Sequence, residues 1–111
     1  MGKRESLELL PGTLDLLILK ALVRGKMHGY GIAQMLKATS EDVLDVGESS
    51  LYPALQRLLL NGWVTAEWGA SDHNRRARYY TLTAAGRKQL NAERADFDRM
   101  VAAIQRVLQT E

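Results

Sequence analysis

Residues 47–86 read GESSLYPALQRLLLNGWVTAEWGASDHNRRARYYTLTAAG and decide the fold of this chain. At their start, apolar residues recur at three- and four-residue spacings, which predicts an amphipathic helix over about residues 49–61. The stripe that this helix would bury consists of Leu51, Ala54, Leu55, Leu58 and Leu59. Ser49 or Ser50 can cap its first turn, and the Asn61-Gly62 pair is typical of a helix end.

Two short strands follow this helix. Residues 63–68 and residues 76–82 are rich in aromatic and β-branched side chains, which predicts an antiparallel hairpin over about residues 63–82. The segment between them, GASDHNRR, is rich in turn formers and too long for a two-residue hairpin loop. Tyr80 is in phase with Leu82, so we expect it to be the buried member of the tyrosine pair.

A helix followed by a hairpin with a cationic tip is the layout of a winged helix-turn-helix. In such a domain one helix enters the major groove of DNA and the hairpin, or wing, lies against the backbone. We therefore expect a mainly α chain with a small β-hairpin, which is an α+β fold. The expected winged helix-turn-helix domain spans residues 1–83, and a C-terminal dimerisation helix spans residues 84–111.

Two apolar surfaces predict a dimer. The helix that follows Pro11-Gly12 is apolar nearly all round, and the residues expected to need a partner chain are Leu16, Leu19 and Val23. Along the last helix, apolar residues recur at heptad-like spacings with Arg94 in the one polar slot. This second surface consists of Leu90, Phe97, Met100, Val101, Ile104 and Leu108. We expect the two surfaces to meet across a two-fold axis.

Composition excludes several classes of protein. The chain has 111 residues and no cysteine, which fits one domain without disulfides or thiolate zinc sites. No signal peptide is recognisable and no apolar run reaches the ~18 residues of a membrane span, so we expect a soluble cytoplasmic protein without a membrane partner. His28 and His73 lie far apart without acidic neighbours at ligand spacing, and no phosphate-binding loop is present. We expect no enzyme activity, metal or cofactor.

Charge is segregated along the chain, although the net charge is only +2. Residues 38–50 carry four acidic residues and no basic one, whereas residues 73–78 carry three arginines, a histidine and no acidic residue. A basic tip on a nearly neutral protein favours contact with nucleic acid, although a merely solvated loop is the alternative.

The expected DNA contacts come from three segments. Opposite its leucine stripe, the helix over residues 49–61 presents hydroxyl, phenol, carboxamide and guanidinium groups, which donate to phosphates and base edges. The alternative is an ordinary solvated helix face. The helix residues expected to contact DNA are Ser49, Ser50, Tyr52, Gln56 and Arg57. Those of the wing are His73, Asn74, Arg75, Arg76 and Arg78, of which Arg76 and Arg78 should share one face.

Four stretches together resemble the PadR family of bacterial transcriptional regulators. They are LLPGTLDLLILKAL (residues 9–22), HGYGIAQML (28–36), SSLYPALQRLLLNGW (49–63) and RRARYYTLTAAG (75–86). The resemblance covers roughly residues 9–90, and NRRARYY is similar to the acidobacterial-type subgroup.

The resemblance implies a homodimer in which the C-terminal helix packs against the partner's first helix. It also implies that the helix over residues 49–61 enters the major groove, that the hairpin around Asn74–Arg78 is the wing, and that Tyr30 lies near the DNA backbone. Members are mostly repressors, and some are released by phenolic or other aromatic compounds.

We therefore expect a sequence-specific, homodimeric repressor that binds double-stranded DNA at a pseudo-palindromic operator. An aromatic small-molecule effector would fit a flat slot between subunits at Phe97 and Met100, although such residues are more often plain core. Two other functions stay open. A protein-interaction module would favour an acidic or apolar wing, and a small-molecule-binding protein without DNA binding would not need the basic turn.

Overall fold

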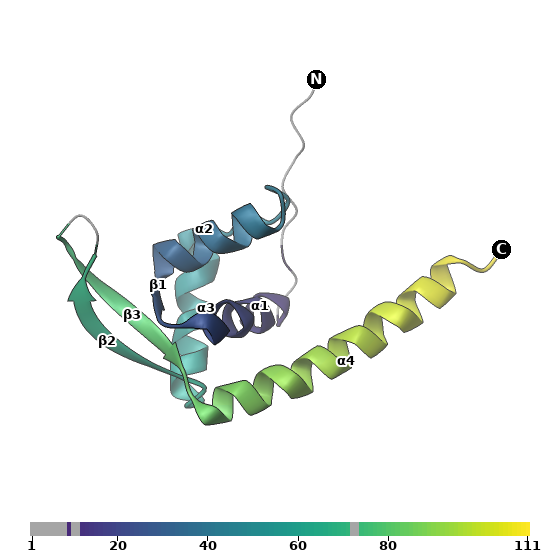
Figure 1. The fold of residues 1–111 in the computed structure, drawn as a ribbon. Helices are drawn as coiled ribbons and strands as arrows, with labels where there is room; N and C mark the ends of the chain where they lie inside the picture. The colour runs from purple at the N-terminus through teal and green to yellow at the C-terminus, as the bar shows by residue number, and fades with distance from the viewer. Residues whose placement is uncertain (1–8, 10–11, 72–73) are drawn as a thin grey trace, which may run out of the picture.

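The structure, a computed structural model, describes Leu9, residues 12–71 and residues 74–111. Helices form the body of the molecule and a small sheet extends from one side of it (Figure 1). In chain order the elements are α1 (Thr13–Ala21), the 3-10 turn η1 (Leu22–Arg24), β1 (Met27–His28), α2 (Gly29–Thr39), α3 (Glu48–Leu60), β2 (Val64–Ala70), β3 (Arg76–Leu82) and α4 (Ala84–Leu108). This mostly helical α+β fold confirms the predicted class.

Helix α3 lies within one residue of the predicted range, but the predicted serine cap is wrong. Gly47 is the N-cap, in an extended conformation, and its carbonyl oxygen accepts hydrogen bonds from the Ser50 and Leu51 amides at 3.1 and 3.0 Å. Ser49 and Ser50 therefore lie inside the first turn rather than before it. Both serine side chains are exposed, so their hydroxyl groups face solvent at the start of α3.

In the described part of the chain the sheet has three strands, one more than the predicted hairpin. β2 and β3 pair in antiparallel register along their whole length, and β1 pairs with the other edge of β3. In that added pair, Met27 lies opposite Tyr80 and His28 opposite Tyr79. A two-residue strand is too short to give a periodic signal in the sequence. Tyr80 is buried in the core, as predicted.

The core surrounds α1, which packs against α2, α3 and α4 (Figure 1). It also includes Val64 and Tyr80 from the sheet. This arrangement corrects the prediction that Leu16, Leu19 and Leu90 face a partner chain. Leu19 is 0% exposed and the other two are also buried, because the helices of the same chain cover them. Packing within one subunit therefore explains why α1 is apolar nearly all round. Val23 is half-buried against the same core.

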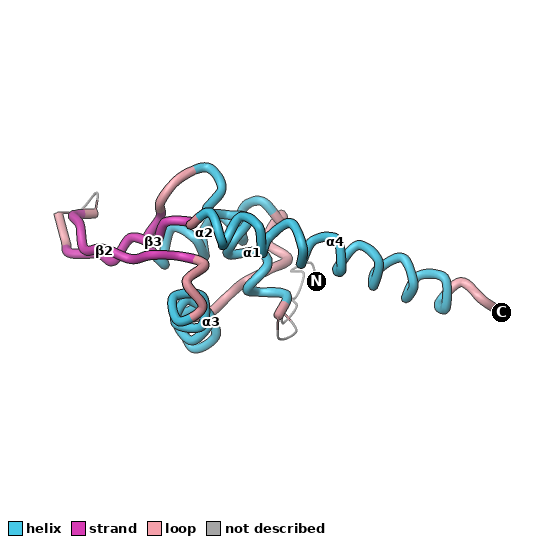
Figure 2. The backbone as a smooth tube through the Cα atoms, turned by 90° about the horizontal axis from the view of Figure 1, so that it is seen from below, coloured by secondary structure: helices cyan, strands magenta, loops and turns pink. Residues whose placement is uncertain are grey.

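Helix α4 begins at a tightly packed junction and then leaves the core. The Thr83 hydroxyl oxygen accepts a hydrogen bond from the Gly86 amide at 2.9 Å and caps the helix, as a threonine at an N-cap does. A Cβ atom at Gly86 would overlap the Trp63 carbonyl oxygen, so this position requires glycine. The helix has 25 residues, a length of about 37 Å, and its second half extends alone (Figure 2).

None of the helices in the described part of the chain combines the length and apolar character that crossing a membrane requires.

Candidate nucleic-acid interface

The first part of the candidate site is the solvent face of α3. Leu51, Ala54, Leu55 and Leu58 bury one side of this helix against the core. The opposite side presents Ser49, Ser50, Tyr52, Gln56 and Arg57, all of which are exposed. In Figure 2 the helix protrudes from the body of the molecule. Because its polar side chains are exposed, this face is open to a large partner. Leu60, which is also exposed, has no explanation in the structure.

The second part is the start of α2, which lies beside α3. The imidazole of His28 caps α2, because its Nδ1 accepts a hydrogen bond from the Gly31 amide at 2.9 Å. The Tyr52 ring of α3 packs over Gly29, where an added Cβ would lie 3.0 Å from the Tyr52 hydroxyl oxygen. Tyr30 is exposed. These contacts fix the start of α2 next to the solvent face of α3.

Sequence reasoning missed two residues in this part of the site. The sequence does not predict the role of His28 as a helix cap, because histidine is not among the preferred N-cap residues. Gln34 was not singled out either, yet its Nε2 donates a hydrogen bond of 2.8 Å to the Tyr30 hydroxyl oxygen. Tyr30 and Gln34 are four residues apart, and on a helix this spacing predicts that two side chains can make contact.

The third part is the wing, defined here as β2, β3 and the loop between them. The Arg76 guanidinium lies 4.7 Å from the centre of the Trp68 ring, and the Arg78 guanidinium lies 5.9 Å from the Tyr80 ring. These contacts place both arginines on one face of the wing, as predicted. An arginine that lies over an aromatic ring keeps its charge and loses part of its conformational freedom. Trp68 is 61% exposed and was not identified from the sequence.

The tip of the wing is closed by hydrogen bonds of its own backbone. The Ser71 amide donates to the Arg75 carbonyl oxygen at 2.8 Å, and the Asn74 amide donates to the Ser71 carbonyl oxygen at 2.9 Å. Asn74 has φ +57°, a left-handed conformation that asparagine tolerates. Arg75 is therefore held at the turn, with its side chain exposed. His73, the remaining predicted wing contact, lies outside the described residues.

A groove of about 940 Å³ joins these three parts. Its walls come from the start of α2, from α3 and from the face of the wing that carries the stacked arginines; the lining residues include Tyr30, Tyr52, Trp68, Arg75, Arg76 and Arg78. Among the described residues that line it there are three arginines and no carboxylate. Burial raises the pKa of the Tyr80 hydroxyl at the base of this groove, and the neighbouring Arg78 cation opposes that shift. The groove therefore presents positive charge and aromatic surface to an anionic partner.

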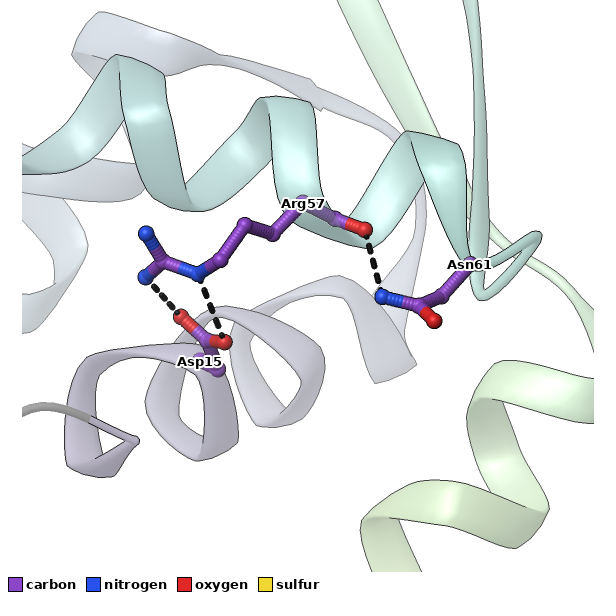
Figure 3. Close-up of polar contacts among 3 residues, drawn as sticks. All are labelled: Asp15, Arg57 and Asn61. Atoms are coloured by element: carbon purple, nitrogen blue, oxygen red, sulfur yellow. Dashed lines mark hydrogen bonds and ion pairs between the residues drawn. The ribbon is translucent and has the colours of Figure 1, made fainter.

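Arg57 differs from the other expected contacts, because its guanidinium is already paired. Its Nη2 and Nε donate to the two carboxylate oxygens of Asp15 in α1, at 2.8 and 3.3 Å (Figure 3). The hydrogen bonds to Asp15 raise the pKa of the guanidinium, although partial desolvation opposes the shift. Arg57, which the sequence predicted as a DNA contact, is thus paired with a carboxylate of its own chain in the structure. Asp15 and Arg57 lie 42 residues apart in sequence, so their pairing could not be identified from spacing.

The candidate dimer surface is the part of α4 beyond the core. Its exposed apolar side chains include Phe97, Met100, Ile104 and Leu108, all of them predicted, and Val107 in addition. Val101 is half-buried. Leu90 belongs to the same heptad pattern but is buried in its own subunit. The predicted dimer surface of α4 is thus divided: its first residue belongs to the core, and the others form an exposed stripe on the second half of the helix.

Within the described residues, no three histidine, aspartate or glutamate side chains gather closely enough to hold a metal ion.

Comparison with protein families matches residues 18–92 to the family described as "Transcriptional regulator PadR-like family". The chain belongs to the PadR-like family. Solved structures agree with this assignment. A transcriptional regulator from Clostridium thermocellum is 26% identical, with a TM-score of 0.79, over 86% of this chain and 92% of that one. A PadR family regulator from Eggerthella lenta is also 26% identical, with a TM-score of 0.77, over 90% of this chain and 85% of that one.

A third PadR-like regulator, from Bacillus cereus, is 25% identical with a TM-score of 0.74, and the match covers 90% of this chain and 95% of that one. These relatives are named as transcriptional regulators, so the family confirms the predicted class of function. As a PadR-like protein, the chain belongs to a family of DNA-binding regulators.

Proposed function

We propose that this PadR-like protein is a homodimeric repressor that binds a pseudo-palindromic operator in double-stranded DNA. In each subunit α3 enters the major groove and the wing lies against the adjacent backbone. The observation that carries this proposal is the groove formed by the start of α2, Tyr52 of α3 and the wing. Among the described residues that line it there are three arginines and no carboxylate, and Tyr52 connects it to the exposed face of α3.

The side chains divide into base contacts and backbone contacts. Ser49, Ser50, Tyr52 and Gln56 are on the solvent face of α3 and are proposed to reach base edges or the nearest phosphates. Arg75, Arg76 and Arg78 are proposed to bind phosphates, together with Tyr30 at the start of α2. Asn74 at the wing tip is proposed to complete the backbone contacts, together with His73, which lies outside the described residues.

The dimer rests on α4. The stripe from Phe97 to Leu108 is apolar and exposed in a single subunit, and about two heptads are too few for a stable coiled coil by themselves. A second copy of the chain, related by a two-fold axis, is proposed to cover this stripe. Residues 1–83 then act as the DNA-binding domain and residues 84–111 as the dimerisation helix. Two recognition helices in such a dimer address half-sites about one helical turn, ~34 Å, apart.

Repression follows from steric exclusion, since a dimer on an operator blocks other proteins from the same DNA. The proposed site of action is the cytoplasm. An aromatic effector is a second proposal, and it rests on Phe97 and Met100, both exposed on the dimerisation stripe. A flat aromatic molecule between the subunits should raise the melting temperature of the dimer, whereas no shift with any aromatic compound of a test panel would contradict this proposal.

Electrophoretic mobility shift with the DNA upstream of the protein's own gene tests the proposed function. The expected result is a retarded band that resists competition by a scrambled duplex and weakens as salt is raised. Competition by the scrambled duplex on equal terms would contradict sequence-specific binding. Absence of a complex at low salt would instead favour a protein-interaction module or a small-molecule-binding protein.

A further inference from the structure

The ion pair between Asp15 and Arg57 joins the first helix to the candidate recognition helix (Figure 3). We propose that Asp15 withholds the Arg57 guanidinium from DNA phosphates and is thereby a specificity-determining residue. The inference rests on the proposed DNA-binding function. It adds a contribution of α1 to sequence discrimination, beside the base contacts that are proposed for the solvent face of α3.

The geometry of the pair is that of a strong, directional contact. Two parallel N–H groups of Arg57 point at the two oxygens of one carboxylate, which is the bidentate arrangement that fixes both position and orientation. The Asp15 side chain is only 14% exposed, whereas that of Arg57 is 52% exposed. Asp15 lies in the first turn of α1, where the helix dipole favours a negative charge. The carboxylate is therefore a fixed anchor, and the arginine is the partner that reaches toward it.

The position of Arg57 on α3 explains why this pairing matters for DNA binding. Arg57 directly follows Gln56, which is at the centre of the exposed face, and it is the one cationic residue within α3. Its backbone is also fixed, because the Asn61 side-chain amide donates to the Arg57 carbonyl oxygen at 2.8 Å. An unpaired arginine beside a base-contacting residue would reach the nearest phosphate on any DNA sequence.

A phosphate contact of this kind would strengthen binding to all sequences alike. Neutralising one phosphate steepens the dependence of log K on log salt by about 0.9 and carries no sequence information. Because a regulator must compete against a large excess of non-specific sites, the ratio of specific to non-specific affinity matters more than affinity alone. Pairing Arg57 with Asp15 removes one such contact per subunit and places a carboxylate at the flank of α3, which disfavours phosphate there.

The experiment compares four variants with the natural chain: Asp15→Asn, Arg57→Gln, the double variant Asp15→Asn/Arg57→Gln, and Glu41→Gln. The last removes one negative charge at an exposed position in the turn that follows α2, outside the proposed DNA and dimer contacts, and it serves as the matched control. Fluorescence anisotropy gives the affinity of each for an operator recovered from random duplexes and for a scrambled duplex, over a range of salt concentrations. Thermal unfolding of each variant defines the temperature at which all are folded.

We expect Asp15→Asn to bind the scrambled duplex more tightly and to steepen the salt slope by about 0.9 per subunit, or about 1.8 per dimer. Between 50 and 200 mM salt, the variant should then lose about twelvefold more affinity than the natural chain. Its ratio of operator to scrambled affinity should fall. Arg57→Gln should leave the salt slope unchanged, the double variant should behave like Arg57→Gln, and Glu41→Gln should behave like the natural chain.

Three results would overturn the inference. A salt slope flattened by Arg57→Gln would mean that Arg57 already contacts phosphate, and this substitution at an exposed side chain decides the matter even if Asp15→Asn fails to fold. A folded Asp15→Asn variant with an unchanged slope would reduce the pair to a structural contact. Failure of the natural chain to bind either duplex at low salt would refute the proposed function itself, and with it the inference.

Discussion

The arginines at and next to the turn of the wing give the most detailed prediction. Arg75 is at the turn and Arg76 lies over Trp68, and each can neutralise one phosphate per subunit. Replacing both by alanine should flatten the slope of log K against log salt by about 0.9 for each phosphate that is no longer neutralised, hence by about 1.8 per subunit if both arginines bind DNA. The preference for one base sequence over another should change little, because phosphate contacts carry no sequence information.

Trp68→Leu separates the charge of the wing from its preorganisation. The substitution keeps both arginines, so the salt slope should stay at its natural value. It removes the ring that restrains the Arg76 guanidinium, and an exposed cation–π contact contributes about 0.5–1 kcal/mol. Affinity for every duplex should therefore fall by about two- to fivefold. The two substitutions thus change different measurable quantities, although they affect neighbouring side chains.

Fluorescence anisotropy titrations at several salt concentrations provide both quantities at once. Arg99→Ala is the matched control, because it removes a cation from α4, where Arg99 pairs with Asp96 at 3.3 Å. The control should leave the slope unchanged. A slope that is unaffected by the replacement of Arg75 and Arg76 would show that the wing does not touch DNA. A salt slope that changes in Trp68→Leu would contradict the claim that Trp68 positions Arg76 without affecting how many phosphates the wing neutralises.

Three further predictions concern other parts of the molecule. Gln56→Ala should relax base preference at one or two positions and cost roughly 1–3 kcal/mol on the best operator, and equal weakening on a scrambled duplex would reassign Gln56 to the backbone. Truncation of both Phe97 and Ile104 to alanine should weaken the free energy of dimerisation by roughly 2–5 kcal/mol for each side chain buried at the interface. The result should be folded monomers that no longer bind the operator. A variant that still sediments as a dimer and still binds the operator would contradict the proposed dimer surface. Gly86→Ala should lower the free energy of unfolding by roughly 1–3 kcal/mol, while Gly47→Ala, at a position with open space around it, should cost less in the same denaturant titration.

Sequence periodicity predicted the elements that frame the site. The leucine stripe of α3 and the Asn61-Gly62 stop defined that helix to within one residue, because long amphipathic patterns are averaged over many positions. The strand from Arg76 to Leu82 was predicted at its observed bounds, and Tyr80 was correctly assigned to the core. These features depend on local chemistry that neighbouring residues share.

Features that depend on distant residues were not predictable in this way. A periodic pattern shows that Leu19 needs cover, but not that α2, α3 and α4 of the same chain supply it. The pairing of β1 with β3 and the ion pair of Asp15 with Arg57 both join segments far apart in sequence. The Gly47 cap was missed because two serines with better capping propensity follow it closely.

Selection of binding sites from a pool of random duplexes, followed by footprinting of the recovered DNA at saturation, tests the central claim most directly. The account predicts enrichment of an inverted repeat whose half-sites lie about one helical turn, ~34 Å, apart, with both halves protected together. Recovery of no preferred sequence, or protection of a single isolated half-site at saturation, would contradict a dimer that reads DNA through two α3 helices and two wings.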